Sequence, residues 1–122
     1  MYQFIEAPAF SRYREDYLDD DGFRELQASL AANPEAGDII PDAGGIRKLR
    51  WRDSRRGKGK RGGLRIIYYC FLQDGDIWLL TLYDKNEASD LSKNQRNQLR
   101  RALEAERAAR KKREVNEPKK DK

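Results

Sequence analysis

Hydrophobic and polar positions in the first third of the chain predict a strand followed by two short helices. In residues 2–6 apolar and polar side chains alternate, and aromatic and β-branched residues are frequent, which favours a strand. Pro8 suits the first turn of a helix, and apolar residues then recur at helical spacing: Phe10, Tyr13, Tyr17 and Leu18. Aspartates at 19–21 end this helix and offer an N-cap to a second one, which terminates at Asn33 and Pro34. The pattern predicts a helical hairpin after the first strand.

The middle of the chain predicts three consecutive strands, over residues 46–51, 64–72 and 77–83. Each is rich in β-branched or aromatic residues, and the linker at 73–76 carries an Asp-Gly pair, which is typical of a hairpin. Residues 37–45 are expected to form a loop, and the two adjacent glycines at its end favour positive φ. Consecutive strands joined in this way form an antiparallel meander.

The last third predicts one helix with a narrow apolar face. Ser92 and Gln95 have the spacing of a capping box, and Leu99 and Leu103 provide an apolar stripe. From about Glu106 onward apolar residues are nearly absent, so we expect a fraying helix that passes into a disordered, charged tail.

Together these elements predict a single α+β domain. A helical hairpin would pack on a small, mainly antiparallel sheet, with a helix at the C-terminal end. The length of 122 residues fits one domain. We place the domain over residues 1–105, and a charged helix end with a flexible tail over residues 106–122.

The composition limits which side chains are available for metal binding and catalysis. Cys70 is the only cysteine and histidine is absent, which excludes an internal disulfide, thiol–imidazole pairs and the usual zinc sites. We expect no metal and no cofactor, so any catalysis must use Lys, Arg, Tyr, Asp or Glu. No apolar run approaches the roughly 18 residues of a membrane span, and the start lacks the features of a signal peptide. We therefore expect a cytoplasmic protein that does not bind membranes.

Charge is unevenly distributed along the chain. Residues 46–65 contain ten Lys or Arg against one acidic residue, whereas the chain as a whole has a net charge of +5. Polyphosphate is the commonest target of such a positive field, and the alternative is a solubilising loop. Glycines and cations at 53–63 suit a mobile loop that contacts RNA or the ribosome through Arg55, Arg56, Lys58, Lys60 and Arg61. The segment matches neither a Walker loop nor a Rossmann fingerprint.

Two cations before this loop share one face of their strand. Lys48 and Arg50 alternate with Arg47, Leu49 and Trp51, so Lys48 and Arg50 can point at a ligand together. The sheet is therefore expected to have a polar face at this position.

Arg65 stands inside an apolar run, LRIIYYCFL, where a solvated charge has no obvious role. One interpretation is an arginine at a strand edge that pairs with an acidic residue of the helical hairpin. We favour the other, in which a rigid strand holds the guanidinium as an electrostatic clamp for a reacting phosphate.

Tyr83 and Lys85 lie at the end of the last predicted strand, where side chains are held firmly and still reach solvent. Both are candidates for RNA contact or catalysis. The alternatives are an aromatic side chain that packs on the final helix, for Tyr83, and a plain surface lysine, for Lys85.

Three motifs, GGIRKLRW, GKGKRGGLRIIYY and LLTLYDKNEASDLS, resemble toxins of bacterial type II toxin–antitoxin pairs in the RelE/HigB group. The resemblance covers residues 2–105, and the middle motif is fairly specific to the HigB-type branch. It implies a fold similar to microbial ribonucleases, in which a helical hairpin packs on a curved antiparallel sheet.

The resemblance also implies an activity and partners. Members of this family are ribosome-dependent mRNA endonucleases that cleave the message in the ribosomal A site and halt translation. Their expected partners are the ribosome, mRNA, ribosomal RNA and a cognate antitoxin that neutralises them. The antitoxin complex, rather than the toxin alone, binds operator DNA.

By position, the resemblance places the family's functional cations on residues of this chain: Arg65 on the strand, Lys48 and Arg50 before the loop, Lys58 and Lys60 within it, and Lys85 after the last strand. The RelE branch has a further arginine and a tyrosine near the start of the last helix. This chain has Asn86 and Ser92 there, which puts a tyrosine general base in doubt.

The reaction expected from these residues is metal-free transesterification, in which the RNA 2′-OH attacks the neighbouring phosphate. Arg65, Lys48 and Lys85 would surround the phosphate, and Lys85 or Lys60 could accept the proton if neighbouring cations lower the pKa of its amine. The rival hypothesis is a nonenzymatic basic module, such as relatives of this fold that poison a topoisomerase.

Overall fold

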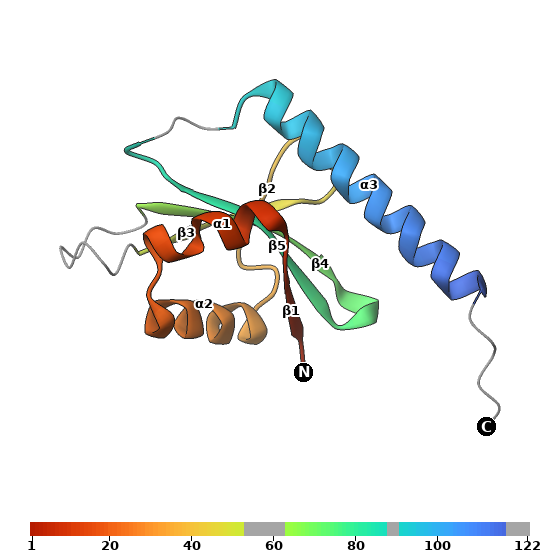
Figure 1. Cartoon of the computed structure of the whole chain (residues 1–122), viewed down its shortest axis with the longest axis horizontal. Helices are drawn as coiled ribbons and strands as arrows, with labels where there is room; N and C mark the ends of the chain where they lie inside the picture. The colour runs from red at the N-terminus through yellow and green to blue at the C-terminus, as the bar shows by residue number, and fades with distance from the viewer. Residues whose placement is uncertain (53–62, 88–90, 117–122) are drawn as a thin grey trace.

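The computed structural model describes residues 1–52, 63–87 and 91–116, and over these ranges it consists of one five-stranded sheet and three α-helices (Figure 1). In chain order the elements are β1 (Gln3–Glu6), α1 (Pro8–Tyr17), α2 (Asp20–Ala32), β2 (Asp38–Ile39), β3 (Arg47–Trp51), β4 (Leu64–Phe71), β5 (Asp76–Asp84) and α3 (Lys93–Asn116). The strand order is β1-β5-β4-β3-β2. The predicted α+β class is confirmed.

The predicted helix boundaries follow from local chemistry. Pro8 occupies the first turn of α1, and the side chain of Asp19 accepts a hydrogen bond of 2.7 Å from the amide of Gly22 at the start of α2. Ser92 and Gln95 form the expected capping box, with each side chain accepting from the other residue's amide. These contacts satisfy backbone donors that a helix start otherwise leaves without partners.

The sheet contains the predicted meander and two features that were not predicted. Strands β3, β4 and β5 pair antiparallel in succession, as expected. However, β1, the first strand of the chain, pairs in parallel with the first half of β5, the last strand. The expected loop at 37–45 includes the two-residue strand β2, which pairs with β3, while Gly44 and Gly45 adopt the predicted positive φ of 74° and 107°.

Each face of the sheet carries its own hydrophobic core. The face under α1 and α2 buries ten residues: Phe10, Leu18, Leu26, Leu30, Leu64, Ile66, Tyr68, Ile77, Leu79 and Leu82. On the opposite face, α3 contributes Leu103 to a smaller buried cluster that includes Ile46, Ile67 and Leu80. β4 therefore alternates between the two cores, since its even-numbered residues face the hairpin and Ile67 faces α3.

One close approach fixes the chain between α2 and β3. The amide of Gly37 donates to the Tyr68 hydroxyl at 2.8 Å, and that hydroxyl donates to the carbonyl of Pro34 at 2.8 Å. A β-carbon at Gly37 would lie 2.9 Å from the ring of Tyr68, so only glycine fits there. Burial of the ring raises the pKa of Tyr68, whose hydroxyl therefore acts as a structural bridge.

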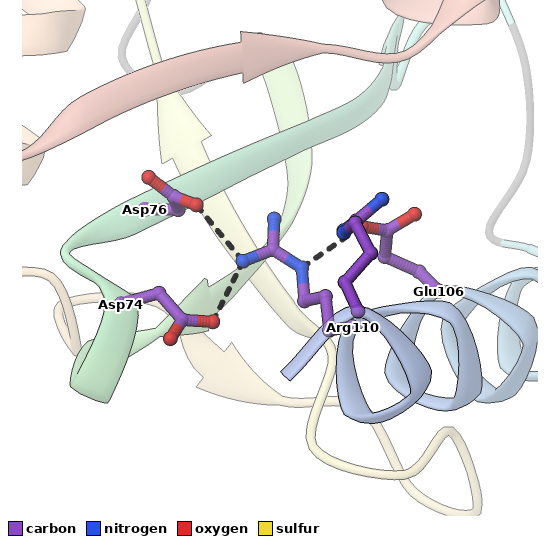
Figure 2. A network of polar contacts seen from close by, with 5 residues as sticks. Asp74, Asp76, Glu106 and Arg110 are labelled. Atoms are coloured by element: carbon purple, nitrogen blue, oxygen red, sulfur yellow. Dashed lines mark hydrogen bonds and ion pairs between the residues drawn. The ribbon is translucent and has the colours of Figure 1, made fainter. Parts of the chain in front are cut away.

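The structure differs from the expected fraying at Glu106, because α3 continues in regular helix to Asn116. Arg110 bonds the carboxylates of Asp74, Asp76 and Glu106, each at 2.8 Å (Figure 2). Its guanidinium also lies 3.8 Å from the ring centre of Phe71. Although partial burial acts in the opposite direction, these hydrogen bonds raise the pKa of Arg110. The charged residues of this segment therefore hold the helix against the β4–β5 turn.

No helix in the described ranges is both long and apolar enough to cross a lipid bilayer.

Candidate functional site

The cations predicted to share one strand face do so, and two residues from neighbouring strands join them. Lys48 and Arg50 alternate along β3 with Leu49, which packs into the core under the hairpin. Arg50 lies directly opposite Arg65 on β4, and Arg65 lies opposite Tyr83 on β5. Directly opposite residues share a face, with β-carbons about 4.5–5.5 Å apart. We call the group Lys48, Arg50, Arg65 and Tyr83 the basic face; it looks away from α1 and α2.

Arg65 is the most buried cation of the basic face, with 6% of its surface exposed. It lies on β4, an inner strand of the sheet. Its neighbours Leu64 and Ile66 belong to the core under the hairpin, and alternation directs Arg65 to the other side. One guanidinium nitrogen donates to the carbonyl of Leu64 at 3.1 Å. This bond helps to fix a planar group that is well shaped for binding phosphate.

The electrostatics of the basic face favour an anion. Arg50 and Arg65 are like charges directly opposite each other, an arrangement that destabilises a sheet. Lys48, two residues before Arg50 on the same face and half-buried, adds a third positive charge. Together these side chains offer several donors to the oxygen atoms of a phosphate.

The position of Tyr83 is compatible with both roles considered for it, packing on the final helix and contact with RNA. It is half-buried and packs against the cluster under α3, close to Leu91 and Leu99, as the packing alternative predicts. It also lies beside Arg65 on the basic face. Its position thus fits both a structural contact with the start of α3 and contact with a ligand.

Lys85 lies where the chain leaves the sheet. Its backbone amide donates to the carbonyl of Gly63 at 2.8 Å, and its side chain is exposed. This hydrogen bond joins the residue after β5 to the residue before β4 at one end of the sheet. The five predicted loop contacts lie outside the described residues: Arg55, Arg56, Lys58, Lys60 and Arg61.

The structure brings two further charged residues to Lys48. A pocket of about 280 Å³ lies between β2, β3 and the start of α3, and Lys48 lines it together with Asp38 and Arg96. Asp38 is directly opposite Lys48 in the sheet. Neither Asp38 nor Arg96 was predicted, although Ser92 marks the helix start and so places Arg96 in the first turns of α3.

Two reactive groups are unsuited to nucleophilic or base catalysis at neutral pH. Burial and a 2.8 Å hydrogen bond to Glu87 raise the pKa of Tyr17 to about 12. Burial also raises the pKa of the Cys70 thiol to about 11, and its sulfur lies 3.2 Å from the Pro34 carbonyl under the hairpin. Both groups stay protonated near pH 7.

Among the described residues there is no group of three or more acidic or cysteine side chains placed to hold a metal ion. The charged groups that converge in this part of the chain are cations from β3 and β4, together with Arg96 from α3 and one carboxylate, Asp38, from β2. The direct chemistry of these cations is the binding and neutralisation of anionic oxygen atoms.

No model of a known protein family matches the chain. Among solved structures, the chain aligns with one from the intact E. coli RelBE toxin–antitoxin complex at a TM-score of 0.49 and 13% identity, covering 69% of this chain and 96% of that one.

Two further alignments have similar extent. A mutant of the E. coli toxin RelE in the free state gives a TM-score of 0.47 at 12% identity, over 71% of this chain and 86% of that one. The archaeal RelE–RelB complex from Pyrococcus horikoshii OT3 gives a TM-score of 0.45 at 22% identity, over 71% of this chain and 98% of that one. The HigB-type assignment stays an expectation from the sequence motifs.

Proposed function

We propose that the protein is the toxin of a type II toxin–antitoxin pair and acts as a ribosome-dependent mRNA endonuclease in the cytoplasm. The three sequence motifs that resemble the RelE/HigB group support this assignment. The solved structures that align with the chain, a RelE toxin and two RelE–RelB complexes, agree with it. In this proposal a cognate antitoxin neutralises the protein, and the complex of the two binds operator DNA.

The single observation that carries the proposal is the placement of Arg65. Arg65 is a buried arginine on an inner strand, and it lies directly opposite a second arginine, so two guanidinium groups are brought to one place on the sheet. Arg65 is also held by its bond to the Leu64 carbonyl, so little reorganisation is needed when charge develops on a phosphate. These properties suit stabilisation of a transition state better than a general attraction to RNA.

The proposed reaction is transesterification at one phosphodiester of the message. The 2′-oxygen forms a bond to phosphorus as the bond from phosphorus to the 5′-oxygen breaks, leaving a 2′,3′-cyclic phosphate. A base accepts the 2′-OH proton, and an acid donates a proton to the leaving 5′-oxygen. Arg65 and Lys48 neutralise the non-bridging oxygens, and Lys85, at the end of β5, is the proposed proton carrier within the described residues.

Cleavage of a defined message in a translating extract tests this function. We expect the wild-type protein to cut mRNA within codons on the ribosome, and Arg65→Ala to reduce the cleavage rate by about 10²-fold or more, as loss of one preorganised charge-stabilising group does. Arg24→Ala is the matched control, because Arg24 is an exposed arginine on α2 that pairs with Asp21 on the hairpin side. It removes the same charge without touching the basic face.

The outcomes separate the proposal from its rival. If Arg65→Ala cuts as fast as wild type at matched folded concentration, Arg65 is not part of the site. If the wild-type protein binds RNA or arrests growth without cutting message, the nonenzymatic binding module, including a topoisomerase poison, is the better reading. Thermal unfolding of each variant excludes a loss of folding as the cause of lost activity.

A further inference from the structure

The pocket beside Lys48 differs in character from the basic face. Asp38 and Lys48 are directly opposite each other on β2 and β3, and Arg96 reaches the pocket from α3. Apolar walls formed by Ile40, Pro41 and Leu91 complete it. The volume of about 280 Å³ is near the lower end of small-molecule sites, so the pocket suits one base or nucleotide.

The position of Arg96 is fixed by the structure rather than left to a flexible surface side chain. It is half-buried, and one of its guanidinium nitrogens donates to the Leu91 carbonyl at 3.2 Å. Leu91 itself lines the pocket and packs with the cluster under α3. Arg96 is therefore held at the pocket wall by the same segment that forms the wall.

Asp38 decides which chemistry the pocket takes. A site for phosphate alone would be weakened by a carboxylate, because two anions repel each other at this range. A carboxylate beside guanidinium and ammonium donors instead matches a base edge that carries both hydrogen-bond donors and acceptors. Single-stranded RNA is read on such base edges, with the flat faces of the base against apolar or aromatic side chains.

We propose that this pocket reads a guanine of the bound message, with Asp38 accepting hydrogen bonds from the ring N1–H and the 2-amino group while Arg96 donates to O6. Of the four bases only guanine presents two adjacent donors, which a carboxylate accepts together. Uracil lacks an amino group, and adenine and cytosine lack the adjacent ring N–H. The inference rests on the proposed function, because that function supplies RNA as the ligand.

The pocket lies close enough to the proposed reaction centre for one RNA strand to reach both. Lys48 lines the pocket, and Arg50, two residues further along β3, faces Arg65. A strand rises about 3.3 Å per residue, so the two places are separated by roughly 7 Å along β3. Lys48 therefore connects the base pocket to the phosphate that Arg65 contacts.

Binding of mononucleotides to the full chain tests the inference without the ribosome. Titrations of 5′-GMP, 5′-IMP, 5′-AMP, 5′-CMP and 5′-UMP, followed by calorimetry, should give the strongest binding for GMP. IMP, which lacks the 2-amino group, should bind more weakly than GMP. Asp38→Asn should weaken GMP binding about tenfold and change CMP binding much less, since a bidentate base contact contributes about 1–3 kcal/mol of discrimination.

Asp42→Asn is the matched control. Asp42 is an exposed aspartate nearby in the chain, it does not line the pocket, and its φ of 59° suits asparagine equally well. This variant should bind GMP like the wild type. Equal weakening by both substitutions would mean that a general change of charge, rather than recognition by Asp38, controls binding, and it would overturn the proposal.

Cleavage of messages that differ at one base completes the test. Asp38→Asn should lose the preference for guanine while still cutting mRNA, and an unchanged preference would overturn the guanine subsite but not the endonuclease. Conversely, GMP-selective binding that depends on Asp38, in a protein that cuts no message, would support the subsite and reject the proposed function. Preference for AMP, CMP or UMP over GMP would overturn the assignment of the base.

Discussion

The face of the sheet under α1 and α2 carries one apolar core that continues across β3, β4 and β5, whereas the opposite face changes character along its length. Under the hairpin, Leu49, Ile66 and Leu82 continue one core from strand to strand. On the other face, Ile67 and Leu80 pack against α3 in the middle, and Arg50 and Arg65 lie at the end near the start of α3. The face under α1 and α2 stabilises the fold along its whole length, whereas on the opposite face only the part under α3 does so.

The same alternation of residues along β4 produces both faces, so neighbouring residues have opposite roles. Ile66 and Arg65 are both nearly inaccessible to solvent, yet one is buried in a hydrocarbon core and the other beside a second arginine. Arg65 is the charged member of this adjacent pair, and its place opposite the exposed Arg50 makes it the candidate for a functional role. Substitutions at adjacent positions can separate the two roles.

The largest effect on stability is expected from Ile66→Ala. Its side chain is fully buried under the hairpin, and removing it leaves a cavity, which typically lowers the free energy of unfolding by about 2–5 kcal/mol. Urea unfolding followed by circular dichroism measures this loss. Leu72→Ala, at a residue that is 47% exposed, should change the same free energy by less than about 0.5 kcal/mol. A loss below 1 kcal/mol for Ile66→Ala would contradict a continuous core on this face.

Arg65→Met should have the opposite effect, with little change in stability and a large loss of cleavage activity. Methionine keeps much of the apolar volume and removes the charge opposite Arg50, so we expect the free energy of unfolding to stay within about 1 kcal/mol of wild type. Cleavage of mRNA should still fall by about 10²-fold. If the variant instead unfolds as easily as Ile66→Ala, Arg65 has a structural role and the contrast between the two faces fails.

The two halves of α3 offer a comparison on a smaller scale. The first half docks through Leu99 and Leu103, and the second half through Arg107, beside Tyr69, and Arg110, above Phe71. The second half therefore depends on charge and aromatic contacts in a partly exposed place.

We expect Arg110→Ala to lower the free energy of unfolding by about 1–2 kcal/mol, because it breaks the contacts to Asp74 and Asp76 and the contact with the Phe71 ring. The loss should shrink in 1 M salt, which screens ion pairs. Lys112→Ala, at an exposed residue of the same helix, is the control. A chain that ends after residue 105 should lose at least as much stability as Arg110→Ala; an unchanged melting temperature would show that the second half of α3 adds nothing.

Local signals in the sequence were enough to predict most of the elements and part of the basic face. Asp19 at a helix start, the Asp-Gly pair before β5 and the alternation at 46–51 each act within a few residues, so they can be interpreted without the fold. Arg65 was identified because a single charge interrupts an apolar run. These positions depend on backbone geometry that neighbouring residues determine.

The contacts that were missed depend on residues far apart in the sequence. Arg110 bonds Asp74 and Asp76, which lie 36 and 34 positions earlier, and composition alone cannot distinguish a paired charge from a solvated one. Likewise, Arg96 meets Lys48 only because α3 crosses the sheet at the end of β2. The parallel pairing of β1 with β5 joins strands from distant parts of the sequence, which no local pattern specifies.

The smallest expected effect concerns the thiol on the hairpin face, and it tests whether that face is closed to solvent as the comparison requires. Burial raises the pKa of Cys70 from 9.0 to about 11, so the unfolded chain releases this proton at lower pH than the folded one. Stability from this group is therefore intact below about pH 9 and is lost as the pH rises toward 11. Cys70→Ser keeps a donor for the Pro34 carbonyl and removes the titrating thiol, so its melting temperature should fall less steeply between pH 9 and 11 than that of the wild type. Equal slopes, together with rapid alkylation of the wild-type thiol at pH 7.5, would show that the hairpin opens far enough to expose Cys70 and that the two faces differ less than the packing indicates.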